Sequence, residues 1–351
     1  MKVVVAPDSY KECLSARRVA QVMGAALREV DPAVEVVEMP LADGGEGTVE
    51  VLTAALGGRI CHATVTGPLG EPVNAAYGWV EAGALAILEV AAACGLPLVP
   101  PERRNPLHTT TRGVGELILD AFGQGCRHFL IGLGGTSTCD GGAGLFSVPG
   151  LRETVSGATF HLLSDVDSPF VGPLGAARIF GPQKGASPEE VEILEQRMEE
   201  RAQEIFRETG VDVRNLPGAG AAGGLGGSMA ALLGARLVSG VEEVLDRVGF
   251  DRALEGADLV LTGEGKSDRQ TLSGKLPLGV LRRSGSVPVA LVSGAIEAPE
   301  ALQEAGFRYL VPVSPPSLSK EEALRPEVAA HNLMHALSAF FRTFTETIPH
   351  A

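Results

Sequence analysis

Five aspartates stand where chemistry is expected, each in a loop directly after a short apolar run. They are Asp8, Asp43, Asp140, Asp165 and Asp268. A single aspartate in such a place is usually a turn former or a helix cap, so some of the five are expected to be caps. Phosphoryl transfer, however, needs carboxylates that hold Mg²⁺, one that accepts the proton of the acceptor hydroxyl, and pliable backbone around them. Together the aspartates indicate a site for magnesium and phosphate.

Cations that could neutralise a phosphate lie near the same loops. The candidates are Lys11, Arg178, Lys184, Lys266 and Lys275. Arginine offers a planar fork that matches a carboxylate or a phosphate, whereas lysine offers a compact charge. With the aspartates, these side chains complete the groups that a phosphate-handling site requires.

The glycine-rich run 218–223, GAGAAG, matches the dinucleotide-binding spacing G-x-G-x-x-G. That motif should directly follow a strand, but Pro217 precedes it and proline is a poor strand ending. A helix is predicted to begin near Ser228. Three interpretations stay open: a redox cofactor site, a cradle for any phosphate at a helix N-terminus, and a tight turn between domains.

A second nucleotide motif fails on spacing. Gly265, Lys266 and Ser267 form the ending of a Walker P-loop, but the first glycine of the motif would fall at Val260. If the protein binds ATP, it does so without a P-loop.

The elements that must position these loops alternate between strands and helices. Short apolar runs predict strands at 2–6, 34–39, 128–133, 258–261, 288–292 and 308–313. The alternation predicts an α/β protein with a largely parallel sheet, whose ligands collect beyond the carboxyl ends of the strands. The stretch 59–88 differs, because its alternation and turn signals predict antiparallel strands that start an inserted second domain. The polar stretch 188–207 predicts a solvated surface helix.

Composition narrows the class of protein. At 351 residues, two domains are expected. A net charge of −14 argues against nucleic acid as a partner. The five scattered cysteines favour a reducing compartment over a disulfide framework. Because neither a signal peptide nor a long apolar span is recognised, we expect a cytoplasmic protein that does not enter a membrane.

Several longer runs give the sequence a family resemblance. They are VVVAPDSYKE at 3–12 with LSA at 14–16, ADGGEGT at 42–48, TGPLG at 66–70, DGGAG at 140–144, RIFGPQKGA at 178–186, PGAGAAGG at 217–224 and TGEG at 262–265. In these runs the chain resembles bacterial glycerate kinases of the glycerate 2-kinase type. The match is collinear over essentially the whole chain.

The resemblance implies a two-domain glycerate kinase fold of the α/β class. One domain would be flavodoxin-like or Rossmann-like with a parallel sheet, formed by 1–60 and 280–351. The other would be a mixed α/β domain inserted at 61–279, with the active site in the cleft between them.

The resemblance also implies an activity: transfer of the ATP γ-phosphoryl group to D-glycerate with Mg²⁺. We expect the 2-hydroxyl as acceptor, giving 2-phosphoglycerate, with the 3-hydroxyl and 3-phosphoglycerate as the alternative. A nicotinamide-dependent oxidoreductase and a non-catalytic metabolite sensor are less favoured. The expected partner is the small molecule glycerate, and a homo-oligomer is left open.

Within that implied activity we assign roles to the candidate residues. Asp43, Asp165 and Asp268 are predicted as catalytic and metal-binding, with Lys11 also catalytic. The predicted substrate-binding residues are Asp8, Ser9, Arg178 and Lys184. The predicted cofactor-binding residues are Gly218, Gly220, Gly223, Gly224, Glu264 and Lys275.

One segment departs from the family pattern. Between Gly144 and Leu163 the chain is shorter than expected. The shortening predicts the loss of at least a surface loop, with a strand edge or an oligomer contact as further candidates for loss.

Overall fold

A computed structural model describes residues 1–347 of the chain, which fold into two compact units. Unit 1 consists of Met1–Asp43 together with the chain from Val244 onward, and unit 2 is Gly44–Glu243. Each unit has its own sheet and hydrophobic core.

Unit 1 is built on a five-stranded parallel sheet. Its order is β13-β11-β9-β1-β2, and the strands are β1 (Lys2–Val5), β2 (Glu35–Glu38), β9 (Leu259–Thr262), β11 (Val289–Ser293) and β13 (Tyr309–Pro312). Every neighbouring pair is parallel. Counted along the chain, the order is 2-1-3-4-5, which is the flavodoxin-like order. The strand order therefore reverses between β1 and β9.

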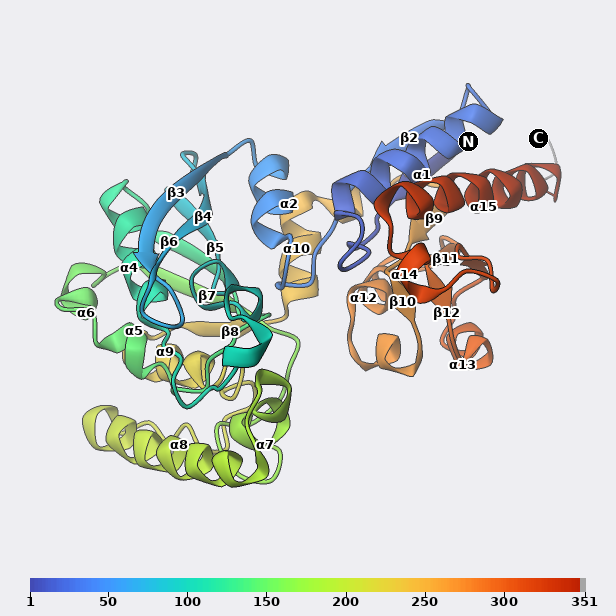
Figure 1. The fold of residues 1–351 in the computed structure, drawn as a ribbon. Helices are drawn as coiled ribbons and strands as arrows, with labels where there is room; N and C mark the ends of the chain where they lie inside the picture. Colours follow the sequence, from blue (N-terminus) through green and yellow to red (C-terminus); the bar gives the residue numbers. More distant parts are fainter. Residues whose placement is uncertain (348–351) are drawn as a thin grey trace. The chain divides into compact units, whose positions relative to one another are not determined.

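Helices cover this sheet and close its core. They are α1 (Ala16–Val30), α11 (Phe250–Leu254), α12 (Leu276–Arg283), α13 (Pro299–Glu304), α14 (Lys320–Ala323) and α15 (Pro326–Thr347). The first and last of these, α1 and α15, lie side by side (Figure 1). Ser15 caps α1, because its side chain accepts a hydrogen bond from the Arg18 N–H.

A second, very short sheet stands at the carboxyl ends of the main strands. It pairs β10 (Lys266–Ser267) with β12 (Ala295–Ile296) in parallel. The 3₁₀ helix η4 (Arg269–Ser273) follows β10. The segment after Gly265 therefore continues as a strand, whereas a P-loop would enter a helix.

Unit 2 contains a six-stranded mixed sheet whose spatial order follows the chain. Its strands are β3 (Arg59–Thr66), β4 (Pro72–Val80), β5 (Leu85–Glu89), β6 (His128–Gly132), β7 (Thr159–Leu163) and β8 (Arg236–Val238). The first three pair antiparallel, as predicted for 59–88, and β5 to β8 pair in parallel.

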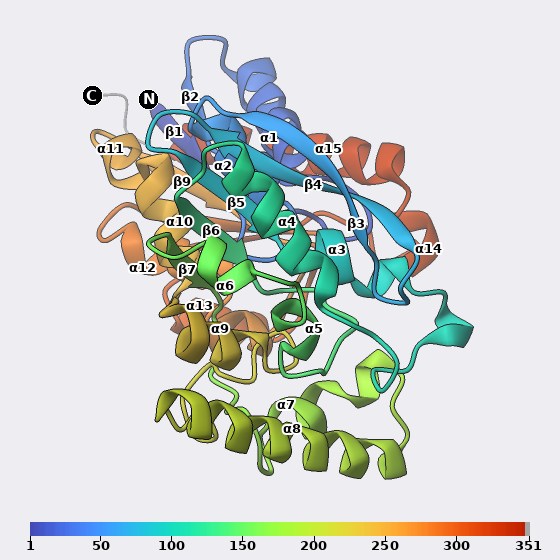
Figure 2. The ribbon, with the colours of Figure 1, turned by 90° about the vertical axis from the view of Figure 1, so that its left-hand side faces the viewer.

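The helices of unit 2 form two groups. Those that contact strands β3 to β5 are α2 (Thr48–Ala55), α3 (Ala91–Cys94) and α4 (Arg112–Gly123), seen across the sheet in Figure 2. The others are α5 (Ala143–Phe146), α6 (Leu151–Thr154), α7 (Ala176–Phe180), α8 (Pro188–Thr209) and α9 (Leu225–Leu233), with the 3₁₀ turns η1 (Leu96–Leu98), η2 (Pro101–Arg103) and η3 (Pro182–Lys184). Helix α10 (Gly240–Val248) carries the chain back to unit 1.

Helix α8 is less solvated than its composition indicates. One stripe of it is buried, namely Val191, Leu194, Met198, Ala202 and Ile205. These positions recur at helical spacing, so α8 is amphipathic and buries an apolar stripe against unit 2.

The α/β fold class is confirmed, but the compact units begin and end elsewhere than predicted. Residues 44–60 lie in unit 2, because α2 contacts β3, β4 and β5. Residues 244–279 lie in unit 1, because β9 pairs with β1. Helix–sheet packing and strand pairing, which join residues distant in sequence, set these boundaries.

The shortened segment leaves the sheet of unit 2 continuous. Strand β7 forms the end of this segment and pairs with both β6 and β8. Over residues 1–347, no helix combines the length and the apolar character needed to cross a membrane.

Candidate active site

The loops after β1 and β9 meet where the strand order of unit 1 reverses. The Asp8 N–H donates to the Gly263 carbonyl at 2.9 Å, which joins the two loops directly. In open α/β sheets this reversal point is where ligands bind. The candidate site in unit 1 is therefore built at the expected edge.

Two carboxylates share this edge. Asp8 is only 5% exposed, and it accepts a hydrogen bond from the Ser9 N–H at 2.7 Å. Burial, followed by repulsion from Asp43, raises the pKa of Asp8 to about 7, although the Ser9 N–H and Lys11 act in the opposite direction. Asp8 and Asp43 thus form a carboxylate pair with Lys11 close enough to act on it.

The loop that carries Asp8 is held rigidly. The Tyr10 hydroxyl donates to the Val292 carbonyl at 2.8 Å, and Tyr10 and Leu14 pair across the loop. Glu12 at its tip has a φ of 64°, a left-handed conformation that is unfavourable for a side chain of this kind. Sequence patterns gave no signal for Glu12, because only the folded backbone reveals this conformation.

Glu264 organises the loop after β9. Its carboxylate accepts hydrogen bonds from Thr271 Oγ1 at 2.6 Å and Ser267 Oγ at 3.2 Å. It also pairs with Lys275 Nζ at 3.1 Å. The predicted cofactor residues Glu264 and Lys275 therefore lie together, within the same unit as Asp8 and Lys11.

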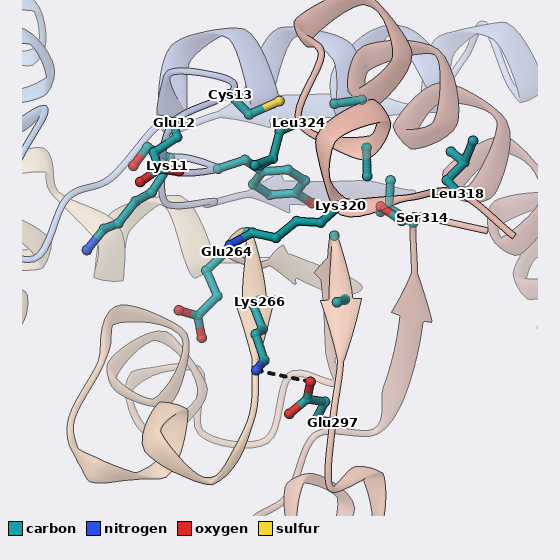
Figure 3. Close-up of a pocket in the computed structure, with 18 of the residues that line it drawn as sticks. Lys11, Glu12, Cys13, Glu264, Lys266, Glu297, Ser314, Leu318, Lys320 and Leu324 are labelled. Atoms are coloured by element: carbon teal, nitrogen blue, oxygen red, sulfur yellow. Dashed lines mark ion pairs between the residues drawn. The ribbon is translucent and has the colours of Figure 1, made fainter. Parts of the chain in front are cut away.

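A pocket of about 650 Å³ opens at this edge of unit 1 (Figure 3). The loops after β1, β9, β11 and β13 all line it. Ser9, Lys11, Glu264 and Lys275 were predicted from the sequence, and all four line this pocket. Glu12, Glu297, Lys320 and the apolar residues of 313–324 also line it and were missed.

The predicted catalytic residue Asp268 lies after β10 in unit 1. It caps η4, because its Oδ1 accepts from the Gln270 N–H at 2.7 Å, and its own N–H bonds to Thr271 Oγ1 at 3.0 Å. Lys266 Nζ lies 3.7 Å from the same carboxylate. Its predicted catalytic and metal-binding roles stay predictions beside this capping role.

The other predicted residues belong to unit 2. Asp165, after β7, is exposed and accepts from Ser239 Oγ at 2.6 Å and from the Val241 N–H at 3.2 Å. It thereby holds the first turn of α10. Arg178 on α7 pairs with Glu192 of α8, its Nη2 lying 2.8 Å from Oε2.

Lys184 is buried, with 4% of its surface exposed. Its Nζ donates to Thr136 Oγ1 at 2.9 Å and to the Thr138 carbonyl at 2.7 Å. Burial lowers the pKa of Lys184. In this position it braces the loop after β6, and its predicted contact with substrate stays a prediction.

The glycine-rich run 218–224 packs against backbone of its own unit. A Cβ added at Gly220 would overlap the Pro169 carbonyl oxygen, and one at Gly223 would overlap that of Thr138. One at Gly224 would meet the Met198 and Phe170 side chains. The close approach that these glycines permit is therefore one between segments of unit 2.

Within residues 1–347, no group of three or more His, Cys, Asp or Glu side chains is arranged to hold a metal ion by itself. Mg²⁺ does not require one, because it is commonly held by one or two carboxylates together with substrate phosphates and water. Buried Asp8 with half-buried Asp43 suits such a cation, since a divalent charge would offset the burial and repulsion that raise the pKa of Asp8.

Fold and site together define an α/β protein with a pocket lined by several lysines at the reversal point of a flavodoxin-like sheet. The glycerate kinase family model matches residues 3–153 and 146–345. The chain therefore belongs to the glycerate kinase family, a family of phosphotransferases.

Individual relatives agree with this assignment. The chain is 43% identical to the glycerate 2-kinase of Escherichia coli (strain K12), covering 84% of this chain and 86% of that protein. It is 41% identical to the glycerate kinase of Bacillus subtilis (strain 168), covering 92% and 93%. A crystal structure from Salmonella typhimurium LT2 that carries the name glycerate kinase 2 matches with a TM-score of 0.84, 39% identity and full coverage of both chains.

Proposed function

We propose that the protein transfers the γ-phosphoryl group of ATP to the 2-hydroxyl of D-glycerate. Family membership supports the kinase reaction and glycerate as acceptor. The name of the Escherichia coli relative, glycerate 2-kinase, supports the 2-hydroxyl.

One observation in the molecule carries the proposal: the Asp43 carboxylate lies close enough to the buried Asp8 to help raise its pKa, with Lys11 and Glu264 also within electrostatic reach of Asp8. Phosphoryl transfer depends mainly on positioning and on stabilising charge. In our proposal Asp43 accepts the proton of the glycerate hydroxyl, and Lys11 stabilises negative charge on the transferred group. Asp8 and Asp43 would also hold Mg²⁺, which, when bound, neutralises phosphate charge.

The chain's own groups keep this pair in place. The Gly263 carbonyl and the Ser9 N–H fix Asp8, and the Tyr10 hydroxyl anchors the loop to β11. Such anchoring limits reorganisation during the reaction, which is how preorganised charges lower a barrier.

A coupled assay of ADP release tests the proposal. Purified protein with MgATP should release ADP only when D-glycerate is present, and excess EDTA should stop the release. ADP release at the same rate without D-glycerate would identify an ATP hydrolase. No release with D-glycerate, from protein that still binds it, would overturn the proposal.

A further inference from the structure

The pocket of unit 1 has a charged side and an apolar side. Figure 3 shows Lys11 and Glu12 toward its left and Leu318 toward its right, with Leu324 and Lys320 between them. The apolar lining comes from Val313, Pro315, Pro316, Leu318, Ala323 and Leu324. A ligand that fills this space needs one charged end and one flat or apolar end.

Lysines are concentrated around this pocket. The chain has only six, namely Lys2, Lys11, Lys184, Lys266, Lys275 and Lys320. Four of the six line the pocket, although the whole chain carries a net charge of −14. Three glutamates, Glu12, Glu264 and Glu297, also line the pocket, so the lysines leave its lining slightly positive in an otherwise acidic protein, which favours an anionic ligand.

The lysines are held in position by acidic neighbours. Lys266 Nζ lies 3.0 Å from Glu297 Oε1, and Lys275 Nζ lies 3.1 Å from Glu264 Oε2. These pairs preorganise the ammonium groups at the rim while leaving Lys266 half exposed. An incoming polyphosphate meets cations that are already ordered.

The size and chemistry of the pocket distinguish the two substrates of a glycerate kinase. A pocket of about 650 Å³ lies within the range that encloses a drug-sized ligand. Glycerate is far smaller and polar throughout, so it has no use for the apolar side. A purine base has two apolar faces, and its triphosphate supplies the charged end.

The competing position for a nucleotide is the glycine-rich run 218–224. There the backbone is approached by Pro169 and Thr138, and the run is almost entirely buried within unit 2. Phosphate oxygens would have to displace these carbonyl groups. The pocket of unit 1 demands no such rearrangement.

We propose that the pocket of unit 1 binds the nucleotide. The base lies on the apolar side formed by 313–324, and the phosphates run along Lys266 and Lys275 toward Asp8. This inference rests on the proposed function, because it names the place of the phosphate donor in that reaction.

Photolabelling with 8-azido-ATP tests the position directly, because the reactive group sits on the base. After trypsin digestion, we expect the label on the peptide 309–320, which ends at Lys320. Excess ATP should suppress the label. A label on the peptide 215–236, which contains the glycine-rich run, would overturn the inference.

A matched pair of variants gives a second test, with MgADP binding measured by calorimetry. Leu318→Asp puts a charge on the apolar side and should weaken MgADP binding at least tenfold. Leu174→Asp is the control, because Leu174 is 65% exposed and lies in unit 2; its binding should stay within twofold of wild type. Equal thermal melting of both variants would show that they fold alike.

The outcome separates this inference from the proposed function. If wild-type protein phosphorylates glycerate while Leu318→Asp binds MgADP as tightly as wild type, the pocket assignment is wrong and the kinase activity stands. If Leu318→Asp alone loses MgADP binding but wild type never turns over glycerate, the pocket assignment stands and the proposed function is wrong.

Discussion

The two units of the molecule share a sequence pattern but differ in the structure that it forms. Each has loops of aspartate and glycine at the carboxyl ends of parallel strands. In unit 1 the loops after β1 and β9 line a pocket, and burial with carboxylate repulsion raises the pKa of Asp8. In unit 2 the corresponding loop after β6 is filled, because Asp140 accepts from the N–H groups of Thr111, Gly142 and Gly144 and from the Thr111 hydroxyl.

The two aspartates differ in the hydrogen-bond donors that surround their carboxylates. The four donors to Asp140 lie between 2.8 and 3.0 Å, which makes it a structural acceptor. Asp8, in contrast, accepts from the Ser9 N–H at 2.7 Å and has the carboxylates of Asp43 and Glu264 as repulsive neighbours. We therefore expect mutation of Asp8 or Asp43 to impair catalysis and mutation of Asp140 to impair stability.

Asp43→Asn should have the largest effect on turnover. We expect kcat to fall by about 10³-fold, equivalent to about 4 kcal/mol, with thermal melting within about 2 °C of wild type. The ADP-release assay and a melting curve measure the two quantities. Glu300→Gln, at an exposed position of α13, is the control. Turnover near wild type in Asp43→Asn would remove Asp43 from the reaction.

Asp140→Ala should show the opposite behaviour. Removing an acceptor of four hydrogen bonds should lower the free energy of unfolding by about 3 kcal/mol. Urea denaturation measures this loss, and the activity per folded molecule should change far less than in Asp43→Asn. A variant that is as stable as wild type but inactive would contradict the assignment of Asp140 as structural.

Glu89 offers a smaller, pH-dependent test within unit 2. Its carboxylate accepts from the Val49 N–H at 2.8 Å at the start of α2. Burial, with repulsion from Glu46, raises the pKa of Glu89 to about 7, although hydrogen bonds from the N–H groups of Val49, Gly47 and Thr48 act in the opposite direction. The folded protein therefore holds this proton more tightly than the unfolded chain, whose glutamates titrate near about 4.3.

The sign of the effect follows from that difference. Below about pH 4 the Glu89 carboxyl is protonated in both the folded and the unfolded state, so it does not lower the free energy of unfolding. As pH rises toward 7 the unfolded chain loses this proton first, and the free energy of unfolding falls. Glu89→Gln removes the charge, so it should be more stable than wild type by about 2 kcal/mol at pH 8, with the gap closing near pH 4. Denaturation at both pH values measures it. A gap that is equal at both pH values would show that folding does not raise the pKa of Glu89.

Much of the fold could be predicted from the sequence because its signals are local. The strand runs and the antiparallel stretch 59–88 depend on neighbours in sequence, and both are confirmed. The domain boundaries depend on β9 pairing with β1 across some 250 residues, which no local pattern records. The buried stripe of α8 shows the same limit, since its abundant charge masks five apolar positions.

The candidate site divides in the same way. Ser9, Lys11, Glu264 and Lys275 were chosen by type and motif, and the structure places all four around one pocket. Lys320 and Leu318 come from a loop remote in sequence, so only the sheet topology brings them there. The glycine run 218–224 could not be judged from its letters, because glycine permits close approach without specifying what approaches.

Phosphorus NMR of the reaction mixture tests the central claim most directly. Purified protein is incubated with MgATP and D-glycerate, and the product signal is compared with authentic 2- and 3-phosphoglycerate. We predict that 2-phosphoglycerate accumulates in step with ADP. Accumulation of 3-phosphoglycerate would contradict the assigned hydroxyl, and ATP that stays unchanged would contradict the kinase itself.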